Sequence, residues 1–113
     1  MPEVIIIDDD PLYREVISNS IRFYHDKETE TYENPAEFLE KYRDNIEGDK
    51  LILTDMMMPE MTGTEFLRML RNKGFDGYAC IVTGTPEEVE RDFQYNGAIP
   101  NTDVLKKPFN KNI

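Results

Sequence analysis

Short apolar runs alternate along the chain with longer segments in which apolar residues recur at helical spacing. Several of the short runs are apolar at consecutive positions, which is typical of strands buried on both faces of a parallel sheet. These runs are VIIID at 4–8, LILTD at 51–55, CIVTG at 80–84 and DVLK at 103–106. The run ETETYE at 28–33 is more polar and predicts an edge strand.

The gaps between these runs predict four helices. Helical patterns begin after Pro11 and also cover 34–42, 62–74 and 85–97. The last pattern starts with Thr85 as a cap and has only Val89 and Phe93 as clear apolar anchors, so we expect that helix to pack lightly. Strands that alternate with helices predict an α/β fold, with a parallel sheet covered by helices on both faces.

Composition narrows the possible partners. The chain has 113 residues, the size of one domain, and 13 Lys plus Arg against 23 Asp plus Glu, a formal net charge of −10. Such a surface repels nucleic-acid phosphates and anionic lipids, so we expect no direct binding to nucleic acid or membrane. A single cysteine, Cys80, and an N-terminus without a signal-peptide pattern indicate a cytoplasmic protein.

The informative polar residues fall at the carboxyl ends of the predicted strands. They are Asp8, Asp9, Asp55, Thr83 and Lys107. Sites in open parallel sheets form outside these ends, where the strand order reverses. A doubly wound five-stranded sheet in the order 2-1-3-4-5 makes strands one and three neighbours, so the three aspartates would meet in one crevice.

Three adjacent carboxylates repel one another at neutral pH, since their unperturbed pKa values lie near ~4. A hard divalent cation such as Mg²⁺ relieves that repulsion, and Lys107 offers a second positive charge. Thr83 adds a hydroxyl donor. This set suits phosphoryl transfer, with Asp55 as the nucleophile that becomes an aspartyl phosphate.

The chain resembles the receiver domain of two-component response regulators, the superfamily of the single-domain chemotaxis regulators. The matching segments cover nearly the whole chain and follow the family's order: IIIDDDP at 5–11, LTDMMMPEMTG at 53–63, IVTGT at 81–85 and KPF at 107–109. The resemblance implies a flavodoxin-like fold in which residues 1–113 form a single receiver domain. It also implies a switch that catalyses only its own phosphorylation and dephosphorylation, rather than an enzyme.

The resemblance assigns a role to each matching residue. Asp55 would be the phosphoacceptor, Thr83 would contact the phosphoryl group and Lys107 would pair with it. The metal ligands would be Asp8, largely through water, Asp9, Asp55 and the main-chain carbonyl of Met57. Pro108 would follow a cis peptide bond. The donor would be a phosphohistidine on a sensor histidine kinase or a phosphotransfer protein, whereas the output partner is not identified and a dimer is left open.

Three departures from the family pattern bear on switching. Val104 stands where the family usually has an aromatic residue that moves with Thr83. Gly84 leaves the site open, so we expect fast loss of the phosphoryl group. The chain reaches Ile113 where the family starts a fifth helix, which we expect to be absent or truncated, with a continuation after 113 left open. Without that helix, apolar side chains of strands four and five would be exposed.

Two other functions are weighed against the switch. A Mg²⁺-dependent aspartyl-phosphate hydrolase usually has a second acid two residues after its nucleophile, where this chain has Met57, and it carries a cap domain for which 113 residues leave no room. A degenerate receiver would act as an unphosphorylated interaction module. The intact Asp9, Asp55, Thr83 and Lys107 argue against it, while Val104 keeps it open for the switching step.

Overall fold

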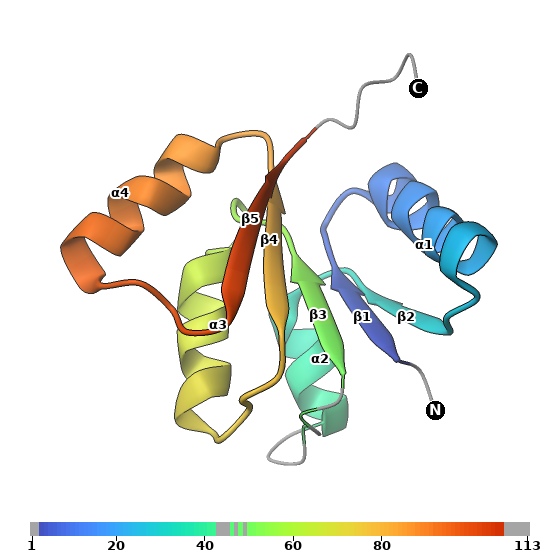
Figure 1. Ribbon diagram of the computed structural model, residues 1–113, viewed down its shortest axis with the longest axis horizontal. Coiled ribbons are helices and arrows are strands. Elements are labelled where there is room, and N and C mark those ends of the chain that lie inside the picture. The colour runs from blue at the N-terminus through green and yellow to red at the C-terminus, as the bar shows by residue number, and fades with distance from the viewer. Residues whose placement is uncertain (1–2, 43–45, 47, 49, 108–113) are drawn as a thin grey trace.

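Five strands and four helices alternate in the part of the chain that the computed structural model describes, residues 3–42, 46, 48 and 50–107 (Figure 1). Each predicted strand and helix is present. In chain order the elements are β1 (Val4–Ile7), α1 (Pro11–His25), β2 (Thr29–Tyr32), α2 (Pro35–Tyr42), β3 (Leu51–Thr54), α3 (Gly63–Asn72), β4 (Ala79–Thr83), α4 (Pro86–Asn96) and β5 (Thr102–Lys106). No fifth helix is among the described residues.

The strands form one parallel sheet in the order β2-β1-β3-β4-β5, as predicted. The register pairs Ile7 of β1 with Tyr32 of β2 and with Thr54 of β3. On the other side of β3, Thr83 of β4 pairs with Lys106 of β5. Because all strands point the same way, the residues that follow them gather along one edge of the sheet. The polar β2 lies at the sheet edge, as its composition indicated.

Helix α1 begins and ends where its sequence requires. The Asp10 side chain caps the helix by accepting hydrogen bonds from the main-chain N–H groups of Leu12 at 3.0 Å and Tyr13 at 3.4 Å. Pro11 occupies the first turn, where a missing N–H donor costs nothing. At the other end Asp26 adopts a left-handed conformation with φ 52° and closes the helix. The cap fixes the turn between β1 and α1, and with it the start of the site.

The larger core lies between the sheet and helices α2, α3 and α4. Phe38 of α2 and Phe66 of α3 are fully buried and meet edge to face, with ring centroids 5.7 Å apart. Val89 of α4 is also fully buried, but Phe93 is only partly buried against the same cluster. Val104 of β5 packs there too. Helix α4 is thus held by few apolar contacts, as its sequence predicted.

The opposite face of the sheet carries α1 alone among the described helices (Figure 1). Its core is small: Val4, Ile6 and Ile17 are buried, while Leu51 and Leu53 are only partly covered. These leucines help to line an apolar groove of about 430 Å³ beside α1. No helix in the described part of the chain is long and apolar enough to cross a membrane.

Apolar side chains of β4 and β5 were expected to be exposed, and this expectation is confirmed for one side chain. Leu105 of β5 is 51% exposed. The expectation is wrong for Val82 of β4, which is buried, whereas Cys80 is buried as its place in an apolar run predicted. The reason is the position of β4 inside the sheet, where Cys80 is flanked by Leu53 and Val82 by Leu105. Only the edge strand leaves an apolar side chain uncovered.

Candidate functional site

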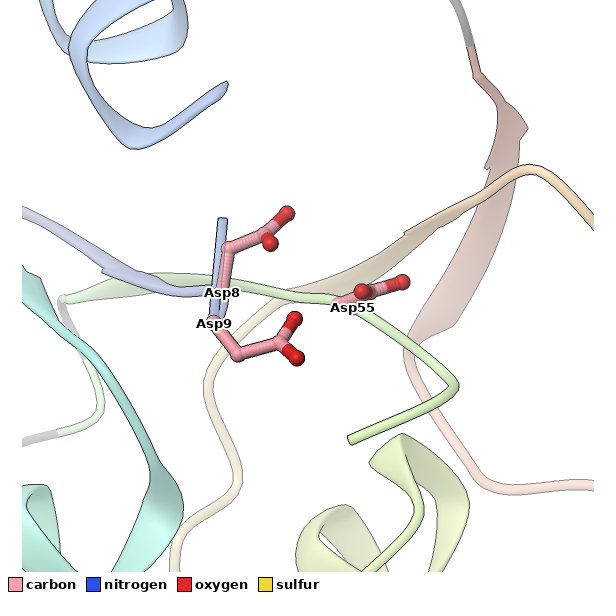
Figure 2. A group of neighbouring side chains, drawn as sticks. All are labelled: Asp8, Asp9 and Asp55. Atoms are coloured by element: carbon pink, nitrogen blue, oxygen red, sulfur yellow. The ribbon is translucent and has the colours of Figure 1, made fainter. Parts of the chain in front are cut away.

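Three carboxylates meet where β1 and β3 end. Asp8 and Asp9 follow β1, and Asp55 follows β3. Because Ile7 pairs with Thr54, the next residues, Asp8 and Asp55, leave the sheet side by side. One carboxylate oxygen from each of the three aspartates lies within 4.8 Å of the others (Figure 2). The structure therefore brings together the three acids that the sequence placed in one crevice.

The loop after β3 holds Asp55 in place. Its main-chain N–H donates to the carbonyl of Ile7 at 2.9 Å, and its side chain accepts from the N–H of Met56 at 2.8 Å. Gly63 closes the loop by donating to the carbonyl of Met56 at 2.8 Å. A Cβ at Gly63 would overlap the main-chain oxygen of Asp55, so only glycine fits this close approach. The loop thus fixes the Asp55 carboxylate at the end of β3, with its side chain 11% exposed.

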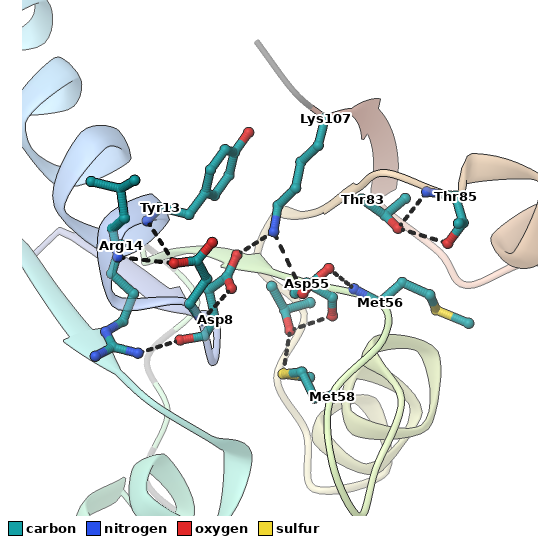
Figure 3. Close-up of polar contacts among 12 residues, drawn as sticks. Asp8, Tyr13, Arg14, Asp55, Met56, Met58, Thr83, Thr85 and Lys107 are labelled. Atoms are coloured by element: carbon teal, nitrogen blue, oxygen red, sulfur yellow. Dashed lines mark hydrogen bonds and ion pairs between the residues drawn. The ribbon is translucent and has the colours of Figure 1, made fainter. Parts of the chain in front are cut away.

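Lys107 brings positive charge to the cluster from the end of β5. Its main-chain N–H donates to the carbonyl of Thr83 at 2.6 Å, which fixes the lysine beside the site. Its Nζ lies 2.6 Å from Asp8 Oδ2 and 3.5 Å from Asp55 Oδ2 (Figure 3). The ammonium is thus bound most closely to Asp8 and points toward Asp55. The expected cis peptide bond before Pro108 lies outside the described residues.

Burial raises the pKa of the Asp55 carboxyl above its ordinary value, and the charge of Asp8 raises it further. Lys107 and the N–H of Met56 act in the opposite direction without outweighing these effects. The cluster thus holds three carboxylates, and the ammonium of Lys107 is paired with two of them, Asp8 and Asp55. A cluster of oxygen ligands that is short of positive charge fits a hard cation such as Mg²⁺.

Thr83 lies at the end of β4 and is almost fully buried. Its hydroxyl accepts from the N–H of Thr85 at 3.0 Å and lies 3.2 Å from the Thr85 hydroxyl. Thr85 occupies the N-cap position of α4 as predicted, but its side chain makes no capping hydrogen bond and is turned toward Thr83 instead. Thr83 is bound to the loop that begins α4, beside Asp55 and Lys107 (Figure 3).

Sequence reasoning missed two residues of the site. Arg14 donates from its guanidinium to the main-chain oxygen of Asp8 at 2.7 Å and so clamps the turn after β1. A signal was present, because the helix dipole disfavours a cation in the first turn of a helix. Tyr13 places its ring under Lys107, with Nζ 4.0 Å from the ring centroid. The helical pattern after Pro11 includes Tyr13, but that pattern does not indicate that its ring meets Lys107.

Comparison with known proteins is consistent with this geometry. Residues 4–113 match the family model described as the response regulator receiver domain. The chain is 30% identical to a transcriptional regulatory protein CpxR homolog from Haemophilus influenzae over 97% of its own length and 45% of that protein. It is 32% identical to the transcriptional regulatory protein FlgR from Helicobacter pylori, over 95% of this chain and 26% of that protein. The chain thus spans less than half the length of these relatives.

Two solved structures are similar to this chain in sequence and in fold. Chemotaxis protein CheY4 from Vibrio cholerae is 29% identical, with a TM-score of 0.75, over 97% of this chain and 89% of that one. The response regulator protein TrrA from Thermotoga maritima, whose structure is a complex with Mg²⁺-BeF, is 25% identical with a TM-score of 0.76. That similarity covers 97% of this chain and 90% of the TrrA chain.

Proposed function

The chain belongs to the response regulator receiver domain family, and from that premise we propose that it is a signalling switch that accepts a phosphoryl group on Asp55. The observation that carries the proposal is the position of Lys107, whose ammonium lies between Asp8 and Asp55 at 2.6 and 3.5 Å. A cation held there can neutralise a phosphoryl group on Asp55 as well as the carboxylate itself.

The proposed donor is a phosphohistidine on a sensor histidine kinase or a phosphotransfer protein. An Asp55 carboxylate oxygen forms a bond to phosphorus while the phosphorus–nitrogen bond of the donor breaks. The electron pair stays on the imidazole nitrogen, which takes up a proton. No general base is needed, because the ionised carboxylate attacks directly. Lys107 then pairs with a phosphoryl oxygen, and the Thr83 hydroxyl donates to another.

The residues present would hold Mg²⁺ through the carboxylates of Asp8, Asp9 and Asp55 and the main-chain carbonyl of Met57. When bound, the ion would neutralise charge on the phosphoryl oxygens and on the acids around them. The Met57 side chain is 54% exposed, which supports a role for its main chain alone. Asp9 is the exposed member of the three aspartates and is reachable by a hydrated ion.

The switching element in this proposal is the loop between Thr83 and α4. A phosphoryl group adds charge and acceptor oxygens, and so competes with Thr85 for the Thr83 hydroxyl. Release of Thr85 would shift the start of α4, which few apolar contacts hold. The small Val104 offers no ring to move with Thr83, so α4 itself would be the surface that an output partner reads. The domain acts by binding such a partner and catalyses only its own phosphorylation and dephosphorylation.

We also propose that residues 1–113 act as one receiver unit in the cytoplasm. The buried free thiol of Cys80 supports that location, because a reducing compartment keeps thiols free. Dimerisation stays open.

The test uses acetyl phosphate and Mg²⁺, followed by intact mass spectrometry. We expect the native chain to gain one phosphoryl group and Asp55→Asn to gain none. Asp26→Asn is the matched control, because Asp26 is exposed at the end of α1 and its left-handed backbone suits asparagine. It should be phosphorylated like the native chain. Phosphorylation that persists in Asp55→Asn would overturn the assignment of the acceptor.

The same experiment separates the rival functions. Sustained hydrolysis of varied phosphate esters would identify a hydrolase, although Met57 supplies no acid two residues after Asp55. No modification and no Mg²⁺ binding would leave an interaction module. The time course also measures the lifetime of the phosphorylated form. Gly84 is exposed, and an added Cβ there would meet nothing within 4 Å, so water has open access and we expect fast loss. A phosphorylated form that lasts many hours would contradict that expectation.

A further inference from the structure

Lys107 has a third neighbour besides its two carboxylates. The ring of Tyr13 lies against the ammonium, with Nζ 4.0 Å from the ring centroid (Figure 3). The lysine side chain is only 16% exposed, so much of its surroundings is protein rather than water. The ammonium is held by Asp8, whose Oδ2 lies 2.6 Å from Nζ, and by the ring of Tyr13, while Asp55 Oδ2 lies 3.5 Å from the same nitrogen.

An aromatic face attracts an ammonium because the ring quadrupole places negative potential above its plane. The attraction is stronger where water is excluded, as it is around Lys107. The ring also accepts the cation without using any carboxylate oxygen, so Asp8 and Asp55 keep their lone pairs for other partners. An aliphatic side chain at this position would fill space but would not attract the charge.

The backbone of Tyr13 is well fixed. Its N–H donates to the capping carboxylate of Asp10 at 3.4 Å, in the first turn of α1. The next residue, Arg14, bonds the main-chain oxygen of Asp8 at 2.7 Å. The ring therefore keeps a constant position relative to Asp8 and the end of β1. The lysine ammonium is carried on a flexible stem of four carbons. A fixed surface beside it is therefore needed to keep the ammonium in one place.

We propose that Tyr13 is a positioning residue for phosphoryl transfer, whose ring holds the Lys107 ammonium at the site as it passes from Asp8 to the phosphoryl group on Asp55. The inference rests on the proposed function. Before transfer, Lys107 is bound most closely to Asp8. After transfer, a phosphoryl group on Asp55 is the more negative partner. The ring face lets the ammonium exchange one partner for the other without entering solvent.

The experiment compares initial rates of phosphorylation by acetyl phosphate and Mg²⁺ in ring variants. Tyr13→Leu should be slower by about tenfold, because the ring attraction is lost. Tyr13→Phe keeps the ring and should restore most of the rate. Tyr24→Leu is the control, since Tyr24 lies on the same helix and is 74% exposed, and it should match the native chain.

Fluorinated phenylalanines at position 13 separate attraction from packing. One, two and three ring fluorines weaken the negative face stepwise and change the shape little. The rate should fall in that order, and the ring-current shift of the Lys107 ε-methylene protons should diminish as the ammonium leaves the ring. A purely structural ring would give equal rates across the series. Thermal unfolding of each variant identifies any variant that does not fold. If Tyr13→Leu does not fold, the fluorinated series alone tests the role of the ring.

The outcomes keep the two proposals apart. If the native chain is phosphorylated and the rate is the same for every fluorinated variant, the role of Tyr13 is overturned and the proposed function stands. If the native chain accepts no phosphoryl group, the proposed function is overturned, and the role of Tyr13 with it.

Discussion

Two carboxylate clusters in this protein are built in opposite ways. At the sheet edge, Glu30 of β2 accepts hydrogen bonds from Lys41 Nζ at 2.6 Å and the Tyr42 hydroxyl at 2.9 Å, and a third from the Tyr32 hydroxyl. One acid there has three donors. At the carboxyl ends of the strands, Asp8 and Asp55 share the ammonium of Lys107, and Asp9 lies beside them as a third acid.

The pKa values reflect this difference. Burial raises the pKa of Glu30, but its hydrogen bonds with Lys41 and the two tyrosines outweigh burial, so that the pKa is lowered overall. For Asp55, burial and the charge of Asp8 prevail and the pKa is raised. The protein therefore supplies its own donors where a carboxylate is structural. Where it leaves carboxylates short of donors, the proposed Mg²⁺ would supply the missing positive charge.

Metal binding should give the largest difference between the two clusters. At a Mg²⁺ concentration about 100 times its dissociation constant, the native chain should gain about 2.7 kcal/mol of unfolding free energy, because only the folded state assembles the ligands. Urea unfolding with and without Mg²⁺ measures this gain. Asp9→Asn should lose most of it, whereas Glu30→Gln should keep it. An equal gain in both variants would show that the ion binds elsewhere.

Neutralising the edge cluster should cost stability. Glu30→Gln weakens three hydrogen bonds to a charged, mostly buried acceptor, so we expect a loss of about 1–2 kcal/mol in urea unfolding at neutral pH. Glu33→Gln is the matched control, because Glu33 is exposed one residue after the same strand, and its effect should stay within about 0.5 kcal/mol. Equal effects would mean that the donors around Glu30 contribute nothing.

The smallest expected change is a gain in unfolding free energy rather than a loss. Without Mg²⁺, Asp55→Asn should stabilise the fold at neutral pH by roughly 0.5–1 kcal/mol, since it removes a charge that the site disfavours. The raised pKa of Asp55 means that the folded state favours the protonated acid, so native stability is lost as the pH rises from 3.8 through the folded pKa. Below that window the native chain and the variant should converge.

Glu30 should show the reverse pH dependence. Its lowered pKa means that its contribution is present above 4.5 and is lost as the pH falls through the folded pKa. The loss of stability caused by Glu30→Gln should therefore shrink toward zero in acid. The gain in stability caused by Asp55→Asn should also shrink toward zero there. Parallel pH profiles for the two variants would contradict the comparison.

Much of the fold follows from local pattern. Runs such as VIII and ACIVT are buried on both faces, and only strands in the middle of a parallel sheet need that pattern. The meeting of Asp8 with Asp55 then follows from strand order alone. Resemblance to a known family supplied the roles of these residues, which the pattern could not.

The details that sequence reasoning missed depend on contacts between distant segments. The ring of Tyr13 meets Lys107 only because of how α1 is rotated on the sheet, and helical spacing does not fix that rotation. Thr85 stands at the N-cap of α4 as predicted, but its hydroxyl is turned toward Thr83 instead of capping the helix. In each case a tertiary contact decided between two locally acceptable arrangements.

The ion pair between Lys107 and Asp8 joins residues 99 positions apart in the sequence. One partner of this ion pair therefore follows the first strand and the other follows the last, and β5 is an edge strand that pairs only with β4. Contacts this distant in sequence close late in folding, because the entropy of the intervening chain must be overcome first. A chain whose last strand is not yet docked, or has frayed from the sheet, has its acids without their lysine. Competence to receive a signal is thus a property of the completed fold.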